Sequence, residues 1–117
     1  MAYALVTGGN AGMGLATCVE LCKLGYYVTL SARSSEKGDE AVHHVRSICP
    51  EAKVNFLTME LASLESVRDF ASAYKALGAP LHLLINNAGI MNTPYHMTVD
   101  GFESQFQVNH LSHFLLC

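Results

Sequence analysis

A glycine-rich loop between an apolar run and an amphipathic segment most constrains the fold of this chain. Residues 3–7 are apolar up to a threonine and lead directly into Gly8-Gly9-Asn10-Ala11-Gly12-Met13-Gly14. Glycine permits the positive φ that such a sharp turn requires, and a bare backbone lets a pyrophosphate approach closely. The free N–H groups and the dipole at the start of the next helix favour the same anion. In this strand–loop–helix context, the segment predicts a dinucleotide-binding loop rather than a turn without a ligand.

The rest of the chain repeats this alternation of short apolar runs and helix-length amphipathic segments. Further apolar runs lie at residues 26–30, 54–59 and 81–85, and the fourth is almost continuously apolar, as in a strand buried on both faces. Helices are expected between the runs, ended in turn by Gly25, by Pro50 and by Gly78 with Pro80, and a fourth helix is expected from Gly101 to the end. The order predicts an α/β fold with a parallel sheet and right-handed crossovers.

Composition excludes several classes of protein. The chain has 117 residues, one domain's worth, of which 50% are hydrophobic and 15% charged, so intrinsic disorder is excluded. A net charge of −3 without a basic run argues against a nucleic-acid partner. No apolar stretch is long enough to predict a membrane span, and the first residues lack a signal-peptide pattern. We therefore expect an intracellular protein of the cytoplasm.

Cysteines and histidines suggest structural roles. None of the four cysteines forms a CxxC pair, and Cys18 and Cys22 lie four residues apart on the expected buried side of a helix. They are interpreted as small core residues of a protein in a reducing compartment. His110 and His113 are three apart and His43 adjoins another histidine, but neither arrangement matches a metal-site pattern. No metal is expected.

The end of the second apolar run indicates the choice of cofactor. In dinucleotide folds an acid at this place binds the ribose 2′-hydroxyl of NAD, whereas an arginine accommodates the 2′-phosphate of NADP. The run is followed by Arg33 and Ser34 and by no carboxylate. Arg33 can fork onto a phosphate and Ser34 can add a hydroxyl. The pattern predicts NADP(H), with NAD(H) the less favoured cofactor; a solvated surface arginine is the alternative interpretation.

The last helix carries an amide on an otherwise mostly apolar stripe. A 4-3-4-3 spacing places on one face Phe102, Phe106, Asn109, His113 and Leu116. A buried amide is costly unless it is hydrogen-bonded, so Asn109 is either a satisfied core residue or a functional one.

Three motifs together resemble the short-chain dehydrogenase/reductase family. Thr7 to Gly14 match its Thr-Gly-xxx-Gly-x-Gly motif, Asn86-Asn87-Ala88-Gly89 match its Asn-Asn-Ala-Gly motif, and Asn109 stands at the position of its active-site Asn. The resemblance implies a Rossmann-type doubly wound sheet, here partial, with four strands in the order 3-2-1-4 and four helices.

The resemblance also implies roles for particular residues. Those expected near the nucleotide are Gly8, Gly9, Asn10, Ala11, Gly12, Met13, Gly14, Arg33, Ser34, Glu60, Leu61, Asn87, Ala88 and Gly89. The family usually has Asp beside adenine where this chain has Glu60, so a surface glutamate is the alternative there. Asn109 is implied to hold a water in a proton relay.

The amino-acid sequence around these motifs resembles the retinol-dehydrogenase-like branch of the family, in residues 81–91, 100–103 and 108–116. This implies an alcohol or carbonyl group on an apolar, retinoid-, steroid- or lipid-like substrate. In the family, the helix that carries Asn109 often packs against a second subunit, which makes a homodimer an expectation.

The family's remaining catalytic residues are not found in this chain. The active site needs Ser and a Tyr-xxx-Lys pair, and none of the five tyrosines has a lysine four residues later. Residues 1–117 are therefore expected to form the N-terminal part of one dinucleotide-binding domain, truncated before the Ser/Tyr/Lys segment. The parent is expected to be an NADP-dependent oxidoreductase and the chain alone to be inactive. The alternative is a non-catalytic short isoform that binds nucleotide or pairs with a full-length partner.

Overall fold

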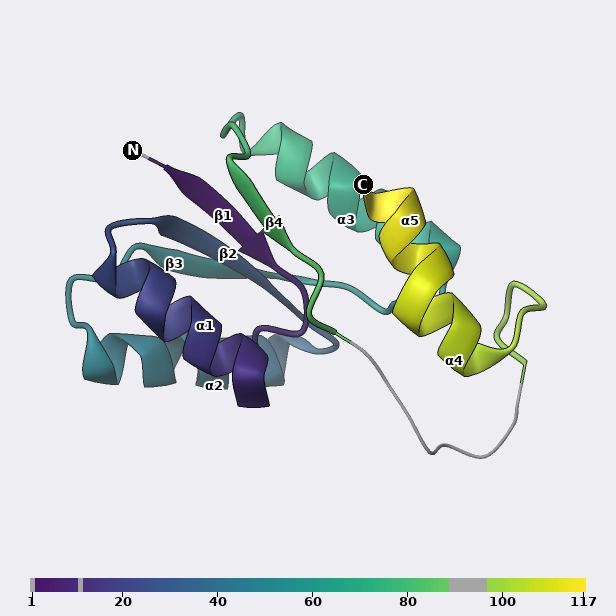
Figure 1. Cartoon of the computed structure of the whole chain (residues 1–117), viewed down its shortest axis with the longest axis horizontal. Helices are drawn as coiled ribbons and strands as arrows, with labels where there is room; N and C mark the ends of the chain where they lie inside the picture. The colour runs from purple at the N-terminus through teal and green to yellow at the C-terminus, as the bar shows by residue number, and fades with distance from the viewer. Residues whose placement is uncertain (1, 11, 89–96) are drawn as a thin grey trace.

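Four parallel strands form a single sheet in the computed structural model, which describes residues 2–10, 12–88 and 97–117 (Figure 1). The strands are β1 (Tyr3–Val6), β2 (Tyr27–Ala32), β3 (Val54–Thr58) and β4 (Leu83–Ile85). Their order is β3-β2-β1-β4, and all three pairings are parallel. The expected order 3-2-1-4 is therefore confirmed, and β1 lies between the two halves of the sheet.

Helices cover both faces of the sheet. They are α1 (Gly12–Lys23), α2 (Ser35–Ile48), α3 (Leu64–Ala76) and a final helical stretch made of α4 (Ser104–Phe106), the π-helical η1 (Gln107–Leu111) and α5 (Ser112–Leu116). Figure 1 shows α1 and α2 on one face of the sheet, and α3 with the final stretch on the other. This is the doubly wound arrangement that the alternation of apolar runs and helices predicts.

Side-chain caps define where the helices begin. The Ser34 and Ser63 side chains accept main-chain N–H groups from the first turns of α2 and α3. Glu103 caps the final stretch by accepting from the N–H groups of Gln105 and Phe106. The expected start of this helix at Gly101 is three residues too early. The helix begins at Ser104 because the Glu103 side chain accepts the first N–H groups that have no partner within the helix.

Two apolar clusters hold the layers together. The larger lies between the sheet and the α1–α2 layer, and its largest fully buried members are Val6, Val28, Leu30 and Val45. The smaller lies on the opposite face and centres on Val67 and Phe70 of α3, with Leu5, Met59, Leu61 and Val108.

Burial of β4 differs from the expectation. Leu83, Leu84 and Ile85 are all only half-buried, although the run was expected to be covered on both faces. Leu83 and Ile85 pack on the larger cluster and Leu84 on the smaller, so β4 does contact the apolar layers on both faces of the sheet. Burial is incomplete because, among the described residues, β4 pairs with β1 alone and forms an edge of the sheet.

Cys18 and Cys22 lie in the larger cluster, as expected. Both are free thiols and both are buried. Burial, with a smaller contribution from neighbouring cysteines, raises the pKa of Cys18 to about 12 and that of Cys22 to about 11. These thiols are therefore protonated and behave as core side chains.

The buried face of the final helical stretch is not the predicted stripe. Phe102, Phe106 and Asn109 are exposed. Of the predicted stripe, His113 is buried, and the other buried side chains are Ser104, Gln107, Val108 and Ser112. In η1 the N–H of Ser112 bonds to the carbonyl of Gln107, five residues earlier, so a 4-3-4-3 spacing does not follow one face across it. The buried amide on this helix belongs to Gln107.

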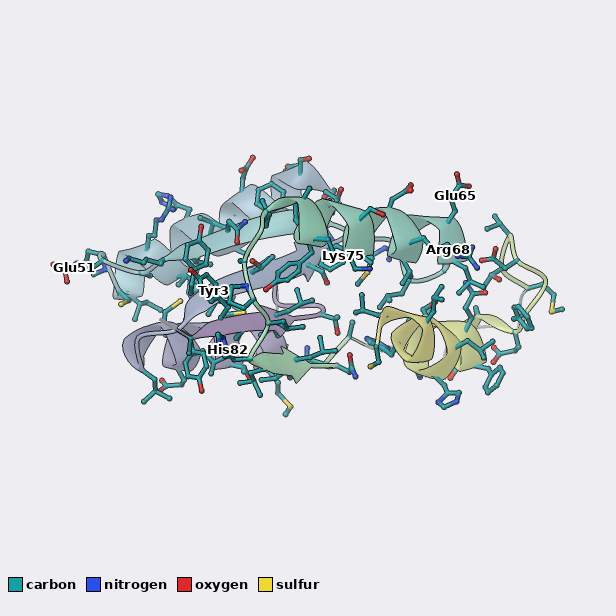
Figure 2. The ribbon with its side chains drawn as sticks, turned by 90° about the horizontal axis from the view of Figure 1, so that it is seen from above. Tyr3, Glu51, Glu65, Arg68, Lys75 and His82 are labelled. Carbon is teal, nitrogen blue, oxygen red and sulfur yellow. The ribbon has the colours of Figure 1, made fainter. Side chains whose placement is uncertain are left out.

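An aromatic cluster closes the end of the sheet where the strands begin. The Tyr3 ring stacks on Tyr27 at a centroid distance of 5.5 Å and on His82 at 6.0 Å. The Tyr3 N–H donates to His82 Nδ1 at 3.0 Å. Figure 2 shows Tyr3 and His82 side by side, away from the final helical stretch.

The described part of the chain offers neither a metal-binding cluster nor a membrane-spanning helix. No three His, Cys, Asp or Glu side chains there gather so as to hold a metal ion. No helix there has both the length and the apolar character needed to cross a bilayer.

Truncation of the ring that centres the smaller cluster should destabilise the fold. Phe70 is 2% exposed, and Phe70→Ala is expected to lower the free energy of unfolding by about 3–5 kcal/mol. Phe106→Ala removes the same atoms from a ring that is 50% exposed and should cost much less. Urea unfolding monitored by circular dichroism compares the two; equal losses would contradict the described core.

Candidate functional site

Four loops meet where the strands end. Because the strands are parallel, their carboxyl ends share one edge, which is where ligands bind in open α/β sheets. The segments that follow β1, β2, β3 and β4 bring there the glycine loop, Arg33 with Ser34, Glu60 with Leu61, and Asn87 with Ala88. The expected nucleotide residues Ala11 and Gly89 lie outside the described residues.

Thr7 joins the glycine loop to the segment after β4 and to the final helical stretch through one oxygen. Its hydroxyl accepts the main-chain N–H of Asn87 at 3.0 Å and that of Ala88 at 3.1 Å. The same Oγ1 lies 2.9 Å from Nε2 of His113, in the final helical stretch. Thr7 is fully buried, so these contacts are shielded from water. The first residue of the loop motif thus holds the Asn-Asn-Ala-Gly segment and the last helix together.

Gly8, the first glycine of the loop, packs against the segment that follows β4. Its N–H donates to the Ser31 hydroxyl at 3.0 Å, and its carbonyl accepts from the Asn87 amide at 3.4 Å. With φ at +63°, a Cβ here would be strained and would lie 2.8 Å from the Cβ of Ala88. Gly8 is needed because two motifs touch at this point. Gly8 is half-buried, Gly9 beside it is buried, and Asn10 is half-buried.

Gly14 lets the first turn of α1 lie against the same contact. A Cβ at Gly14 would overlap the Gly8 carbonyl oxygen and the Asn87 amide nitrogen. Gly12 and Met13, the first residues of α1, are exposed at this edge. The amino end of a 12-residue helix therefore faces outward beside the loop, with N–H groups and a dipole that favour an anion.

Arg33 and Glu60 form an ion pair at the ends of β2 and β3. Arg33 Nε donates to Glu60 Oε2 at 2.9 Å, and Glu60 Oε1 accepts from the Ala62 N–H at 3.0 Å. The Arg33 side chain is 76% exposed and that of Glu60 39%, so the pair contributes at most about 1 kcal/mol to stability. Its effect is geometric, because a carboxylate fixed by main chain orients the guanidinium. The Ser34 hydroxyl beside them accepts from the Lys37 N–H at 3.3 Å.

Leu61 anchors the final helical stretch at a second point. Its side chain is buried in the smaller cluster. Its carbonyl accepts from Gln107 Nε2 at 3.3 Å and from the Ser112 hydroxyl. Gln107 also donates to Asp100 at 2.9 Å, and Asp100 accepts the Leu64 N–H at 2.8 Å. These bonds satisfy the buried amide, as its burial requires.

Asn109 lies in η1 between these two anchors, on the exposed side of the helix. Three residues that hold this part of the helix were not predicted from the sequence. Gln107 and Ser112 bond to the Leu61 carbonyl, and His113 contacts the Thr7 hydroxyl. Burial lowers the pKa of His113, and hydrogen bonds to the main chain at Val108 and Asn109 oppose that shift. A buried polar side chain in an apolar helix is the signal these residues offer, and it does not identify their partners.

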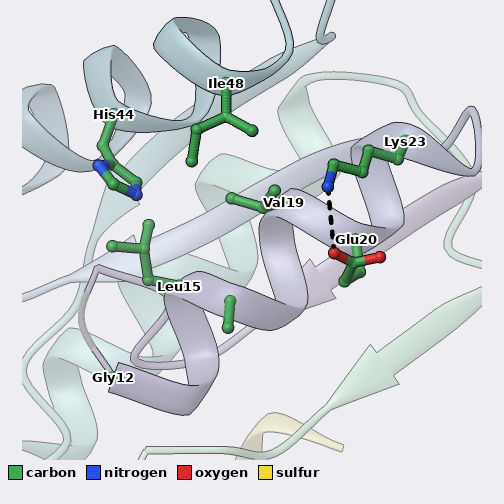
Figure 3. Close-up of a pocket in the computed structure, with 8 residues that line it drawn as sticks. Gly12, Leu15, Val19, Glu20, Lys23, His44 and Ile48 are labelled. Carbon is green, nitrogen blue, oxygen red and sulfur yellow. Dashed lines mark hydrogen bonds and ion pairs between the residues drawn. The ribbon is translucent and has the colours of Figure 1, made fainter.

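A hollow between α1 and α2 is separate from this edge. Figure 3 shows its lining by Leu15, Val19, His44 and Ile48, with the Lys23–Glu20 ion pair of 3.4 Å at one side. Its volume is about 370 Å³. Gly12 alone among the expected nucleotide residues lines it, so it does not bring the predicted site residues together.

Comparison with protein families gives a match over nearly the whole chain. The family model described as short chain dehydrogenase matches residues 2–117. A polyprenol dehydrogenase of Mus musculus is 47% identical over 113 residues, covering 97% of this chain and 34% of the relative. The short-chain dehydrogenase/reductase drtF of Aspergillus calidoustus is 49% identical over 112 residues, covering 96% and 36%. The chain thus spans about a third of the length of these relatives.

Solved structures give the same result. A Mycobacterium paratuberculosis protein superimposes with a TM-score of 0.85 at 40% identity, covering 99% of this chain and 40% of its own. A metagenomic short-chain oxidoreductase solved in complex with NADP gives a TM-score of 0.81 at 27% identity, covering 98% and 52%.

A methyl group at Gly14 should separate the two motifs that meet there. Gly→Ala inside a helix normally stabilises by about 0.5–1 kcal/mol, but Gly14→Ala is expected to destabilise by about 1–3 kcal/mol because of the overlap with Gly8 and Asn87. Gly12→Asn is the control, since open space surrounds Gly12 and Asn tolerates positive φ. Stabilisation by Gly14→Ala in urea unfolding would contradict the described contact.

Proposed function

This chain belongs to the short-chain dehydrogenase family, and on that premise we propose that it forms the NADP(H)-binding portion of an oxidoreductase. The parent enzyme would interconvert alcohol and carbonyl groups. The observation that carries the choice of NADP(H) is the orientation of Arg33 by Glu60. Within the described ranges, the ion pair of Arg33 engages Nε, which leaves the Nη groups to a phosphate.

The residues at this edge fit the parts of the nucleotide in turn. Arg33 and Ser34 would take the 2′-phosphate, and the glycine loop with the start of α1 would take the pyrophosphate. Glu60 and Leu61 would lie beside the adenine, and Asn87 and Ala88, with Gly89, beside the ribose. The cofactor, when bound, supplies hydride transfer. Asn109 is proposed, from the family resemblance, to hold a water for proton transfer.

The substrate proposal is an apolar alcohol or carbonyl compound of retinoid, steroid or lipid type. It is supported by the resemblance of residues 81–91, 100–103 and 108–116 to the retinol-dehydrogenase-like branch. A relative named for a polyprenol, itself a long apolar alcohol, points the same way. An intracellular setting, which the unpaired cysteines suit, and a homodimer through the helix that exposes Phe106 belong to the same proposal.

Removal of the Arg33 guanidinium should weaken binding of one cofactor and not the other. Arg33→Ala is expected to lower NADPH affinity about tenfold or more, because charge-assisted phosphate bonds contribute roughly 1.5–3 kcal/mol. NADH, which lacks the 2′-phosphate, should bind as before. Isothermal titration with both nucleotides measures this, with Arg68→Ala on the exposed side of α3 as the matched control (Figure 2). Unchanged NADPH affinity would refute the assignment.

The 117-residue chain should bind nucleotide without turning over substrate. It contains no Tyr-xxx-Lys pair, so the acid/base that delivers the proton is missing. NADPH mixed with the chain and an apolar aldehyde should keep its absorbance, while titration shows binding. Oxidation of NADPH in proportion to the chain's concentration would overturn this account of its catalytic residues.

A further inference from the structure

One buried histidine ties the helix that carries Asn109 to the end of β1. His113 Nε2 lies 2.9 Å from Thr7 Oγ1, across a sequence separation of 106 residues. Both side chains are buried. No other contact described at this edge joins the last helix directly to the end of β1. The direction of the hydrogen bond between these two atoms therefore determines how the helix is held at the end of β1.

The hydrogen-bond inventory of Thr7 determines the direction of this bond. A hydroxyl oxygen has two lone pairs and one proton. The N–H groups of Asn87 and Ala88 both donate to Thr7 Oγ1, at 3.0 and 3.1 Å, and so occupy the lone pairs; the Asn87 N–H also donates to the Ile85 carbonyl at 3.1 Å. The proton alone remains for the third partner. Thr7 is thus the donor and His113 Nε2 the acceptor, which leaves Nε2 without a proton.

The other ring nitrogen has a complementary partner. Hydrogen bonds with the main chain at Val108 and Asn109 favour the protonated form of the His113 ring, so they run from the imidazole to carbonyl oxygens. Those carbonyls belong to η1, the π-helical segment. With Nε2 accepting from Thr7, the one proton of a neutral imidazole is on Nδ1. The ring therefore bridges η1 and the end of β1 as one neutral tautomer.

We propose that His113 is a positioning residue that accepts a hydrogen bond from the Thr7 hydroxyl. This bond turns the lone pairs of the Thr7 oxygen toward the N–H groups of Asn87 and Ala88. It thereby fixes the nucleotide edge relative to the helix of Asn109. The proposal rests on the proposed function of that edge. Without an acceptor at His113, the buried Thr7 proton must find another one. Its rotation would withdraw a lone pair from Asn87 or Ala88, which pack against Gly8 and Gly14.

A plain packing role for His113 makes the opposite prediction about substitutions. The ring is 6% exposed, so a packing residue would be replaced best by Phe, which fills the same space with an apolar ring. An acceptor would be replaced best by Gln, whose side-chain oxygen reaches about as far as Nε2. The order of the two variants therefore separates the two roles, whatever the absolute size of the effects.

The first test reads the tautomer directly and needs no nucleotide. The chain is labelled with ¹⁵N-histidine, and long-range ¹H–¹⁵N spectra are recorded about one pH unit above the ordinary imidazole pKa of ~6.5. His113→Gln identifies its signals by their loss. An unprotonated Nε2 and a protonated Nδ1 are expected. A proton on Nε2 would overturn the proposal, even if NADPH binds as proposed.

The second test measures NADPH affinity by isothermal titration. His113→Phe is expected to weaken binding by about tenfold, the loss typical of one buried polar group left unpaired, and His113→Gln by less than about threefold. His110→Phe, an exposed position on the same helix, is the control and should bind as the unaltered chain does. Gln weaker than Phe would overturn the proposal. If the unaltered chain does not bind NADPH, the proposed function fails, while the tautomer result still decides the role of His113.

Discussion

The structure depends on the single oxygen of the Thr7 hydroxyl. It is fully buried at the end of the central strand β1, and it contacts two consecutive N–H groups after β4 and a histidine in the last helix. Elements that are far apart in the chain thereby take fixed positions at one edge of the sheet. The glycines of the loop complete the arrangement, because Gly8 and Gly14 lie where a Cβ would collide with Ala88 or Asn87. This edge of the sheet, which we propose binds the nucleotide, is thus closely packed.

The Leu61 carbonyl is the second point at which the last helix is held. It receives Gln107 and Ser112, while Thr7 receives His113, so the π-helical η1 is anchored on both sides of Asn109. Two anchors restrict both the position and the rotation of a helix, as one would not. The segments after β3 and β1, which we propose lie beside the adenine and the pyrophosphate, are thereby connected to the residue proposed for proton transfer. The proposed function depends on this connection between the nucleotide-binding segments and Asn109.

Local signals in the sequence predicted the alternation of strands and helices and the parallel sheet, whereas the strand order was implied by the family resemblance. The glycine loop and the short apolar runs each act over a few residues and can be recognised in the local sequence. The face of the last helix was predicted wrongly, because the turn at Gln107–Leu111 is π-helical and a spacing rule assumes 3.6 residues per turn. The partners of Gln107 and His113 lie 46 and 106 residues away, so no local pattern could identify them. The half-burial of β4 follows from which neighbours it has, which its own apolar residues do not specify.

Mapping the nucleotide onto the main chain tests the central claim most directly. In a ¹⁵N-labelled chain titrated with NADPH, the account predicts that amide shifts change at Gly12, Met13, Arg33, Ser34 and Asn87, all at the carboxyl edge of the sheet. The amides of Tyr3, Tyr27 and His82, in the aromatic cluster at the opposite end, should not move. Changes centred instead on the α1–α2 hollow around Val19 and His44, or on the aromatic cluster, would contradict it.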